Sequence, residues 1–185
     1  DGFATTAACE ACPANTFSGA GAAACEPCPD GATSDGAAAI CTCSPGHAVV
    51  MHDGNLQCIR CEPGMYSVTG GPCLGCPAGT YNSEFNATES LPCPPSSGST
   101  GSAATCTCNA GYESAGEGDD LICAACEPGT YNDVAGDVQC KDCPDGSTST
   151  SSAATTCTCK AGYVTNGLSG SDLVCTACPS GWLLG

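Results

Sequence analysis

The sequence predicts a small disulfide-rich fold: an elongated tandem array of small modules with short β-hairpins and turns and little or no helix. Two observations lead to this prediction. Of 185 residues, 21 are cysteine, while Leu, Ile, Val and Phe together also number only 21. With a formal net charge of −16, so few large apolar residues leave a chain disordered unless cysteines stabilise it. The cysteines also recur regularly, which predicts repeats held by disulfides.

The cysteine spacing divides the chain into repeats. Seven pairs have the spacing C-x-x-C, three have C-x-C, and most loops between them contain 11 to 15 residues. The C-x-C doublets begin at Cys41, Cys106 and Cys157 and mark equivalent points of successive repeats. The expected divisions are repeat 1 at 1–58 with a lead-in at 1–8, repeat 2 at 59–123 with one extra loop at 76–92, repeat 3 at 124–175, and the start of repeat 4 at 176–185.

Each loop is expected to begin with a tight turn. Glycine stands three residues after the leading cysteine in most loops, and Asn15 takes this place in the first loop. The segment 62–64 reads Glu-Pro-Gly, which puts Pro and Gly at the central positions of a type II turn, where the third residue has positive φ. Asn is the commonest substitute for glycine in that conformation. The loop that starts at Cys93 departs from the pattern, because its glycine is delayed to Gly98.

One aromatic residue in most loops is the expected substitute for a conventional core. Tyr81 and Tyr131 follow the turn glycine by two positions, whereas Tyr112 and Tyr163 follow it directly, and His47 occupies the same slot as these last two. A ring in this position can pack on a neighbouring disulfide. No segment has a helical period, so short strand pairs and turns are the expected secondary structure.

Two disulfide schemes fit the order of the cysteines. In a crossed scheme, the first four cysteines of a repeat pair one with three and two with four, and the last two pair together. In a ladder each loop closes on itself. We favour the ladder because it leaves only Cys76 without a partner in the extra loop, where Ser90 replaces the closing cysteine. Cys9 and Cys178 also stay unpaired within the segment and stand where a bridge to further chain would be. The ladder joins Cys12–Cys25, Cys28–Cys41, Cys43–Cys58, Cys61–Cys73, Cys93–Cys106, Cys108–Cys123, Cys126–Cys140, Cys143–Cys157 and Cys159–Cys175.

The sequence resembles known extracellular modules. The patterns C-x-x-C-[PE]-x-G-[TM]-Y, C-P-D-G-[AS]-T-S and C-T-C-x-x-G-Y resemble the cysteine-rich repeats of ephrin-receptor ectodomains. The first loop is similar to the opening module of tumour necrosis factor receptor repeats, and the C-x-C-x-x-G-Y ending to the C-terminal half of an EGF-like domain. The filler rich in Ala, Gly, Ser and Thr is similar to that of algal and protist flagellar hair (mastigoneme) proteins. The resemblance implies EGF/TNF-receptor-like modules of a receptor, adhesion, matrix or filament protein.

Glycosylation is the predicted modification. Residues 86–88 read Asn-Ala-Thr, an N-glycosylation sequon within the extra loop, so Asn86 is the expected acceptor. Two runs rich in Ser and Thr are either flexible polar loops or O-glycan acceptors. Their candidate hydroxyls are those of Ser96, Ser97, Ser99, Thr100, Ser147, Thr148, Ser149 and Thr150.

Metal binding and catalysis find little support in the sequence. The first four cysteines mimic a zinc ribbon, but the regular self-closing loops favour disulfides. Asp53 and the pair Asp119 and Asp120 lack the spacing of an EF-hand calcium loop. The two histidines have no acid–nucleophile arrangement nearby and form no catalytic triad. We therefore expect no catalytic residue, no metal site and no cofactor.

The expected protein is a non-catalytic extracellular structural glycoprotein, a subunit or segment of a surface filament or flagellar-hair-like assembly. Dense disulfides persist in oxidising compartments, so the expected location is extracellular or at the cell surface. Three Lys and Arg against 19 Asp and Glu argue against nucleic acid, and no apolar run is long enough to span a membrane. The expected partners are other copies of the chain, neighbouring modules in a filament, and glycans. A receptor or adhesion ectodomain that binds a protein ligand is the alternative.

Overall fold

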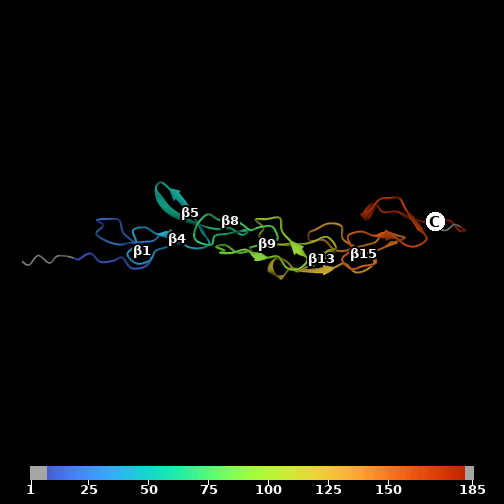
Figure 1. Cartoon of the computed structure of the whole chain (residues 1–185), viewed down its shortest axis with the longest axis horizontal. Helices are drawn as coiled ribbons and strands as arrows, with labels where there is room; N and C mark the ends of the chain where they lie inside the picture. The colour runs from blue at the N-terminus through green and yellow to red at the C-terminus, as the bar shows by residue number, and fades with distance from the viewer. Residues whose placement is uncertain (1–7, 182–185) are drawn as a thin grey trace, which may run out of the picture. The chain divides into compact units, whose positions relative to one another are not determined.

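The chain folds into a series of short antiparallel hairpins. The computed structural model describes residues 8–181, in which ten two-stranded sheets each join strands that are consecutive in sequence (Figure 1). The described residues contain no α-helix. The fold is therefore small and disulfide-rich, as the sequence predicts. The lead-in at 1–8 and the start of repeat 4 lie largely or partly outside the described residues.

Seven of the hairpins have strands of only two residues. They are β1 (Thr16–Phe17) with β2 (Glu26–Pro27), β3 (Ala32–Thr33) with β4 (Thr42–Cys43), β7 (Met65–Tyr66) with β8 (Leu74–Gly75), β9 (Thr80–Tyr81) with β10 (Leu91–Pro92), β11 (Ser97–Gly98) with β12 (Thr107–Cys108), β15 (Thr130–Tyr131) with β16 (Lys141–Asp142), and β17 (Ser147–Thr148) with β18 (Thr158–Cys159). Strands this short are marginal by themselves, so the hairpins depend on the bonds that close them.

The three longer hairpins each follow a C-x-C doublet. They are β5 (His47–His52) with β6 (Asn55–Arg60), β13 (Tyr112–Ala115) with β14 (Ile122–Ala125), and β19 (Tyr163–Thr165) with β20 (Cys175–Ala177). The last two contain a single 3-10 turn before the second strand, η1 (Gly118–Asp120) and η2 (Gly170–Asp172).

A tight turn opens the loops, as the glycine pattern predicts. In the loop that starts at Cys126, the Thr130 N–H donates to the Glu127 carbonyl at 3.0 Å across Gly129, whose φ is 94°. Asn15 takes the same position in the first loop with a φ of 64°.

The loop that starts at Cys93 has its turn in the usual place despite the late glycine. Ser96 adopts a φ of 62°, and the Ser97 N–H donates to the Pro94 carbonyl at 3.2 Å. A serine therefore occupies the left-handed position that other loops give to glycine or asparagine.

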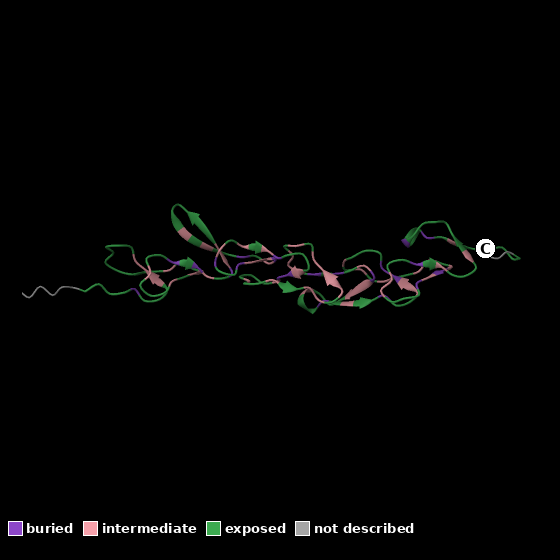
Figure 2. Ribbon diagram, in the orientation of Figure 1, coloured by how far each residue is buried: buried purple, intermediate pink, exposed green. Residues whose placement is uncertain are grey.

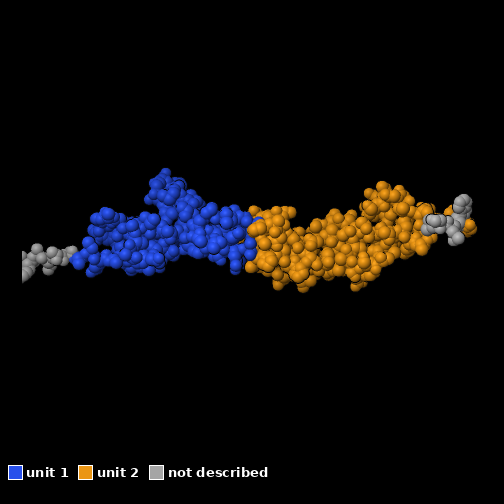
Figure 3. Space-filling view, in the orientation of Figure 1, with its two compact units in different colours: residues 1–76, 84–90 blue, residues 77–83, 91–185 orange. Residues whose placement is uncertain are grey.

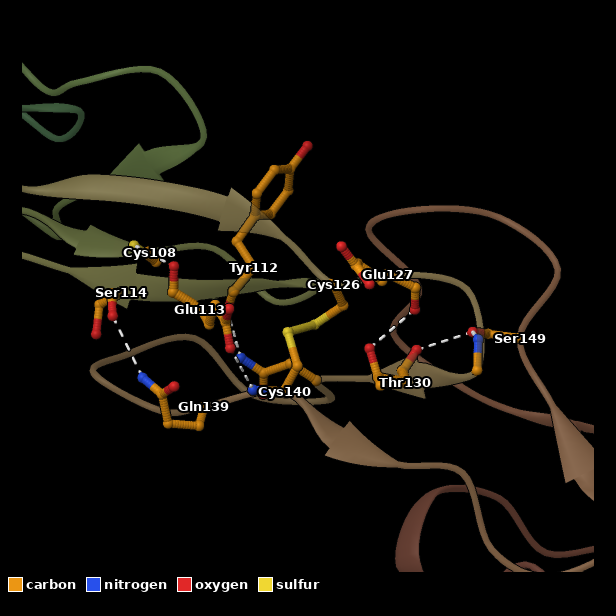
Figure 4. The surroundings of a disulfide bond; sticks show 12 residues. Cys108, Tyr112, Glu113, Ser114, Cys126, Glu127, Thr130, Gln139, Cys140 and Ser149 are labelled. Atoms are coloured by element: carbon orange, nitrogen blue, oxygen red, sulfur yellow. Dashed lines mark hydrogen bonds between the residues drawn. A yellow bond between two sulfur atoms is a disulfide. The ribbon is translucent and has the colours of Figure 1, made fainter.

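Hydrogen bonds join each loop to the next. The Cys143 N–H donates to the Gly129 carbonyl at 2.9 Å, and the Gly129 N–H donates to the Ser149 carbonyl of the following loop at 3.1 Å. The Ser149 hydroxyl then donates to the Thr130 carbonyl at 2.8 Å (Figure 4). The preceding repeat has the same arrangement, with Gly79, Ser99 and Thr80. These contacts use main-chain groups and one serine hydroxyl, so the loops stack without a large apolar interface.

Small apolar clusters stand where an ordinary domain has one core. Tyr81 is 7% exposed and packs with the half-cystines Cys106 and Cys108 and with Leu121. The next cluster contains Tyr131, which is 2% exposed, with Cys157 and Leu173. Buried residues accordingly occur in short stretches between exposed ones (Figure 2). Aromatic rings on neighbouring disulfides thus form the predicted minimal core.

His47 takes the position of a tyrosine. A Cβ atom on Gly146 would lie 2.7 Å from the Tyr163 ring, and one on Gly31 would lie 2.6 Å from the His47 ring. The two rings therefore cover equivalent glycines of the preceding loops, and a side chain at either glycine would collide with the ring. This packing accounts for His47 without a metal.

The chain divides into two compact units (Figure 3). One comprises residues 1–76 and 84–90, and the other comprises residues 77–83 and 91–185. The division falls within the extra loop of repeat 2.

Candidate functional site

The disulfides are the chain's principal chemical feature. Nine bonds each close one loop, with 12 to 16 residues of sequence separation and Cα–Cα distances of 5.5 to 5.8 Å. They join the same nine pairs as the ladder scheme, and no crossed pair occurs among the described residues. Cys12, Cys25 and Cys28 are half-cystines, so the zinc-ribbon-like spacing at the start of the chain supplies no set of thiolates.

The Cys126–Cys140 disulfide lies beside contacts between neighbouring loops. The Cys140 N–H donates to the Glu113 carboxylate at 3.2 Å, and the Gln139 side-chain amide donates to the Ser114 carbonyl at 3.3 Å (Figure 4). The side-chain amide of Asn132, which is fully buried, donates to the Tyr112 carbonyl at 2.6 Å. The loop closed by this disulfide is therefore anchored on the β13–β14 hairpin before it.

The extra loop lacks its disulfide but keeps the register of the others. Tyr81 pairs with Leu91 across β9 and β10, as Tyr131 pairs with Lys141 across β15 and β16. The residue before Lys141 is the half-cystine Cys140, and the residue before Leu91 is Ser90. Ser90 thus occupies the position of a closing cysteine, as its sequence alignment predicts.

Cys76, the residue that Ser90 leaves without a partner, is buried. Its side chain is 3% exposed, and its N–H donates to the Gly64 carbonyl at 2.9 Å. Burial raises the pKa of the Cys76 thiol above its ordinary value, an effect that the main-chain hydrogen bond partly opposes. A buried thiol of raised pKa is a poor nucleophile. Cys9 is exposed and Cys178 half-buried, and both are free.

Asn86 is placed where a glycan could be attached. Its side chain is exposed, as is that of Thr88, the third residue of the sequon. Its main chain is held in the left-handed conformation, with a φ of 59°, and its N–H donates to the Cys61 carbonyl at 3.0 Å. Gly46 lies against the Asn86 backbone, and a Cβ atom there would overlap it. The loop therefore fixes the backbone of Asn86 and leaves its side chain in solvent.

A cation–π contact lies beside this sequon. The Arg60 guanidinium stacks over the Phe85 ring at 4.3 Å from the centroid. The sequence analysis did not identify this pair, because nothing in the repeat pattern links the end of β6 with the extra loop.

The eight candidate O-glycan hydroxyls fall into two groups. Five of them donate to main-chain carbonyls and are buried or half-buried: Ser97, Ser99, Ser147, Thr148 and Ser149. Of the other three, Thr100 and Thr150 are exposed and Ser96 is half-buried. The first five hydroxyls are engaged in hydrogen bonds, so the exposed pair are the better acceptors.

The acidic residues that could suggest calcium have other roles. Asp53 lies in the β5–β6 turn with one oxygen 3.1 Å from the exposed His52 ring. Asp119 accepts a hydrogen bond from the Ser83 hydroxyl at 3.1 Å and also contacts Tyr81. Burial, followed by the hydrogen bond to Asp119, raises the pKa of Tyr81 above its ordinary value. Within residues 8–181, no group of three His, Cys, Asp or Glu is arranged to hold a metal ion.

Comparison with known families gives one match. Residues 117–159 match the model of a family described as tyrosine-protein kinase ephrin type A/B receptor-like. No curated protein matches the chain. The model describes a non-catalytic disulfide-rich ectodomain module, and the matched segment runs from η1 to the C-x-C doublet of repeat 3. The chain therefore contains cysteine-rich repeats like those of ephrin-receptor-like ectodomains, and its nine disulfides indicate an extracellular protein. No helix within residues 8–181 is long and apolar enough to cross a membrane.

Proposed function

We propose that the chain is a non-catalytic structural glycoprotein, a subunit or segment of a surface filament or flagellar-hair-like assembly. The observation that carries the proposal is that each of the nine disulfides closes a single loop, which stabilises that loop without a distant partner. Successive loops then add to one another through main-chain hydrogen bonds. Repeats that contact only their neighbours can be extended indefinitely, which suits a filament.

The surface chemistry is consistent with a structural role. The acidic residues are spread along the chain, with 19 acids against three Lys and Arg, which favours solubility in a crowded extracellular layer. The proposed partners of the chain in such an assembly are other copies of the chain, neighbouring modules and glycans.

Electron microscopy of native material tests the filament role. Regular filaments that contain this chain would support the proposal. A monodisperse particle that assembles only after a separate ligand is added would contradict it.

The second candidate is a receptor or adhesion ectodomain that binds a protein ligand. The match of residues 117–159 to an ephrin-receptor-like family favours this alternative. It predicts a saturable complex with a different protein and no ordered self-assembly, so the same electron microscopy separates the two candidates.

Glycosylation at Asn86 is part of the proposal and has its own test. Digestion with peptide-N-glycosidase should lower the mass of the secreted chain by one N-glycan. The variant Asn86→Gln should already have the lower mass, whereas Asn82→Gln should remain glycosylated, because Asn82 is buried and outside a sequon. An unchanged mass after digestion of the wild-type chain would contradict N-glycosylation.

A further inference from the structure

The extra loop is a long segment that no disulfide closes. Between Cys12 and Cys175, the chain outside the nine closed loops consists of residues 74–92 and of connections of one or two residues between half-cystines. Those short connections all lie in paired β-strands. A cut of the main chain within a closed loop leaves both sides joined through the disulfide, whereas a cut within residues 74–92 divides the chain in two.

The middle of this segment is exposed and can open without breaking a covalent bond. All of residues 84–89 are exposed except Ala87, which is half-buried. Two main-chain hydrogen bonds anchor them: the Asn86 N–H donates to the Cys61 carbonyl at 3.0 Å, and the Ser67 N–H donates to the Ala87 carbonyl at 3.0 Å. Exposed loop tips of this kind are where proteases preferentially cut, after local opening of the chain.

The N-glycosylation sequon lies at the centre of the same segment. Residues 86–88 are the one sequon of the chain, so the sequon and the unclosed loop coincide. Asn86 stands between Glu84 and Glu89, and its side chain points into solvent. An N-glycan is bulky and hydrophilic, and a protease must accommodate residues on both sides of the bond that it cuts. A glycan on Asn86 therefore obstructs access to the bonds around it.

We propose that residues 84–89 form a proteolytic processing site that the N-glycan on Asn86 protects. An extracellular endopeptidase that reaches this segment hydrolyses one peptide bond. Water adds its hydroxyl to the carbonyl carbon and a proton to the departing amine, which leaves a new carboxylate and a new amino terminus. This inference rests on the proposed glycosylation of Asn86 and not on the filament role.

The two pieces that result keep their own disulfides. None of the nine bonds crosses residues 74–92, so four remain in the first piece and five in the second. Each piece also keeps most of one compact unit. Cleavage at this place therefore separates the chain into parts that stay locally stabilised, which cleavage within a closed loop does not do.

Digestion of the secreted full chain with an endopeptidase specific for glutamate tests the proposal. Cleavage after Glu84 or Glu89 divides the chain, as a non-reducing denaturing gel shows. Cleavage after the glutamate that precedes the first disulfide removes only the start of the chain: Glu10. Three glutamates precede proline, whose ring and missing N–H make the bond a poor substrate: Glu26, Glu62 and Glu127. Two lie in the loop that Cys108–Cys123 closes, where a cut becomes visible only after reduction: Glu113 and Glu117.

The variant Thr88→Ala removes the sequon and keeps Asn86, so the main chain of the loop is undisturbed. It should be divided at least about tenfold faster than the glycosylated wild-type chain, because the protease then reaches the opened segment freely. Thr88→Ser keeps a sequon, is the matched control, and should resist division like the wild type. Thr88→Ala combined with Glu84→Gln and Glu89→Gln should stay in one piece. Cleavage after Glu117, which is exposed, should proceed alike in all four chains.

Two results would overturn the proposal. Equal rates of division for the glycosylated wild-type chain and Thr88→Ala would overturn the protection. A Thr88→Ala chain that stays in one piece after Glu117 has been cut would overturn the cleavage site.

Failure of the glycosylation is seen separately. A wild-type chain whose mass peptide-N-glycosidase leaves unchanged contradicts N-glycosylation and, with it, the protection. Rapid division of that chain would still support the cleavage site, whereas a glycosylated wild-type chain that is divided as fast as Thr88→Ala leaves the glycosylation standing and refutes its protective role.

Discussion

At the scale of single residues, one substitution determines the chemistry of the extra loop. Ser90 stands where the register of β9 and β10 requires a cysteine, and Cys76 is left as a buried thiol. The sequence predicts this missing cysteine, because the Ser-Leu-Pro-Cys of 90–93 aligns with the Cys-Glu-Pro-Cys of 25–28. It does not predict the burial of Cys76, since burial depends on the loop that precedes it.

Ser96 shows that a serine can take the turn position that other loops give to glycine or asparagine. The glycine pattern predicts the turn positions in the other loops, but after Cys93 the glycine is delayed to Gly98, and Ser96 adopts the left-handed conformation in its place. The closure of the loop by Cys93–Cys106 and the hydrogen bonds around the turn outweigh the cost of a positive φ for serine.

Cys76 is expected to react slowly with thiol reagents. At mildly alkaline pH and in the native state, iodoacetamide should modify Cys76 at least about tenfold more slowly than the exposed Cys9, because burial both shields the thiol and raises its pKa. Mass spectrometry of peptides from a labelling time course measures the two rates. The denatured chain, in which both thiols should react alike, is the control, and equal rates in the native chain would contradict the burial of Cys76.

The variant Ser90→Cys is expected to form a tenth disulfide with Cys76. The two positions are as far apart in sequence as Cys126 and Cys140, whose separation is 14. In the chain-entropy model, closing a loop of this length stabilises the folded chain by about 3 kcal/mol. Denaturant unfolding and a free-thiol count measure the gain. Ser90→Ala should retain three free thiols, and an Ser90→Cys chain with four would show that the register is wrong.

Tyr81 is expected to make stability depend on alkaline pH. Its pKa in the folded chain is raised above the ordinary value of about 10, so its contribution is fully present below pH 10 and is lost as the pH rises through the folded pKa. Tyr81→Phe should lower the free energy of unfolding near neutral pH by about 1–2 kcal/mol, through loss of the hydrogen bond to Asp119. Its stability should also fall less steeply above pH 10. Tyr66→Phe is the control, and identical alkaline profiles for wild type and Tyr81→Phe would refute the assignment.

At the scale of elements, the three long hairpins are alike in their base and differ in their ends. Short strand pairs are predictable, because cysteine doublets, turn residues and aromatics recur at fixed offsets. The 3-10 turns η1 and η2 are not, because a single leucine after a Gly-x-Asp segment has no periodicity to identify it. The direct Asp53-Gly54 turn of the first long hairpin is a known hairpin signal, and its two residues have φ values of 50° and 80°, as in a type I′ turn.

The leucine after η2 is expected to contribute much of the stability of its repeat. Leu173 is 5% exposed against Tyr131 and Cys157, so Leu173→Ala should lower the free energy of unfolding by about 2–4 kcal/mol. Leu168→Ala, in the same loop but at a side chain that is 58% exposed, should change it by less than about 0.5 kcal/mol. Denaturant titration of both variants makes the comparison, and equal losses would show that the cluster is not a core.

At the scale of the whole molecule, stability comes from many local bonds. Large apolar residues are too few for one core, and each of nine disulfides closes a loop whose contribution is about 3 kcal/mol in the chain-entropy model. This organisation is predictable from the sequence, because short loops between regularly spaced cysteines favour local closure. Function is less predictable from the sequence, because glycan occupancy, self-assembly and ligand binding depend on exposed surface residues that vary between repeats.

Mapping of the disulfides in the secreted, non-reduced chain by mass spectrometry of its peptides tests the central claim, that each loop closes on itself. The expected result is nine intraloop bridges, among them Cys12–Cys25 and Cys28–Cys41, with Cys76 as a free thiol. A bridge from Cys12 to Cys28, or any other bridge between loops, would contradict the ladder and with it the local stability on which the structural role rests.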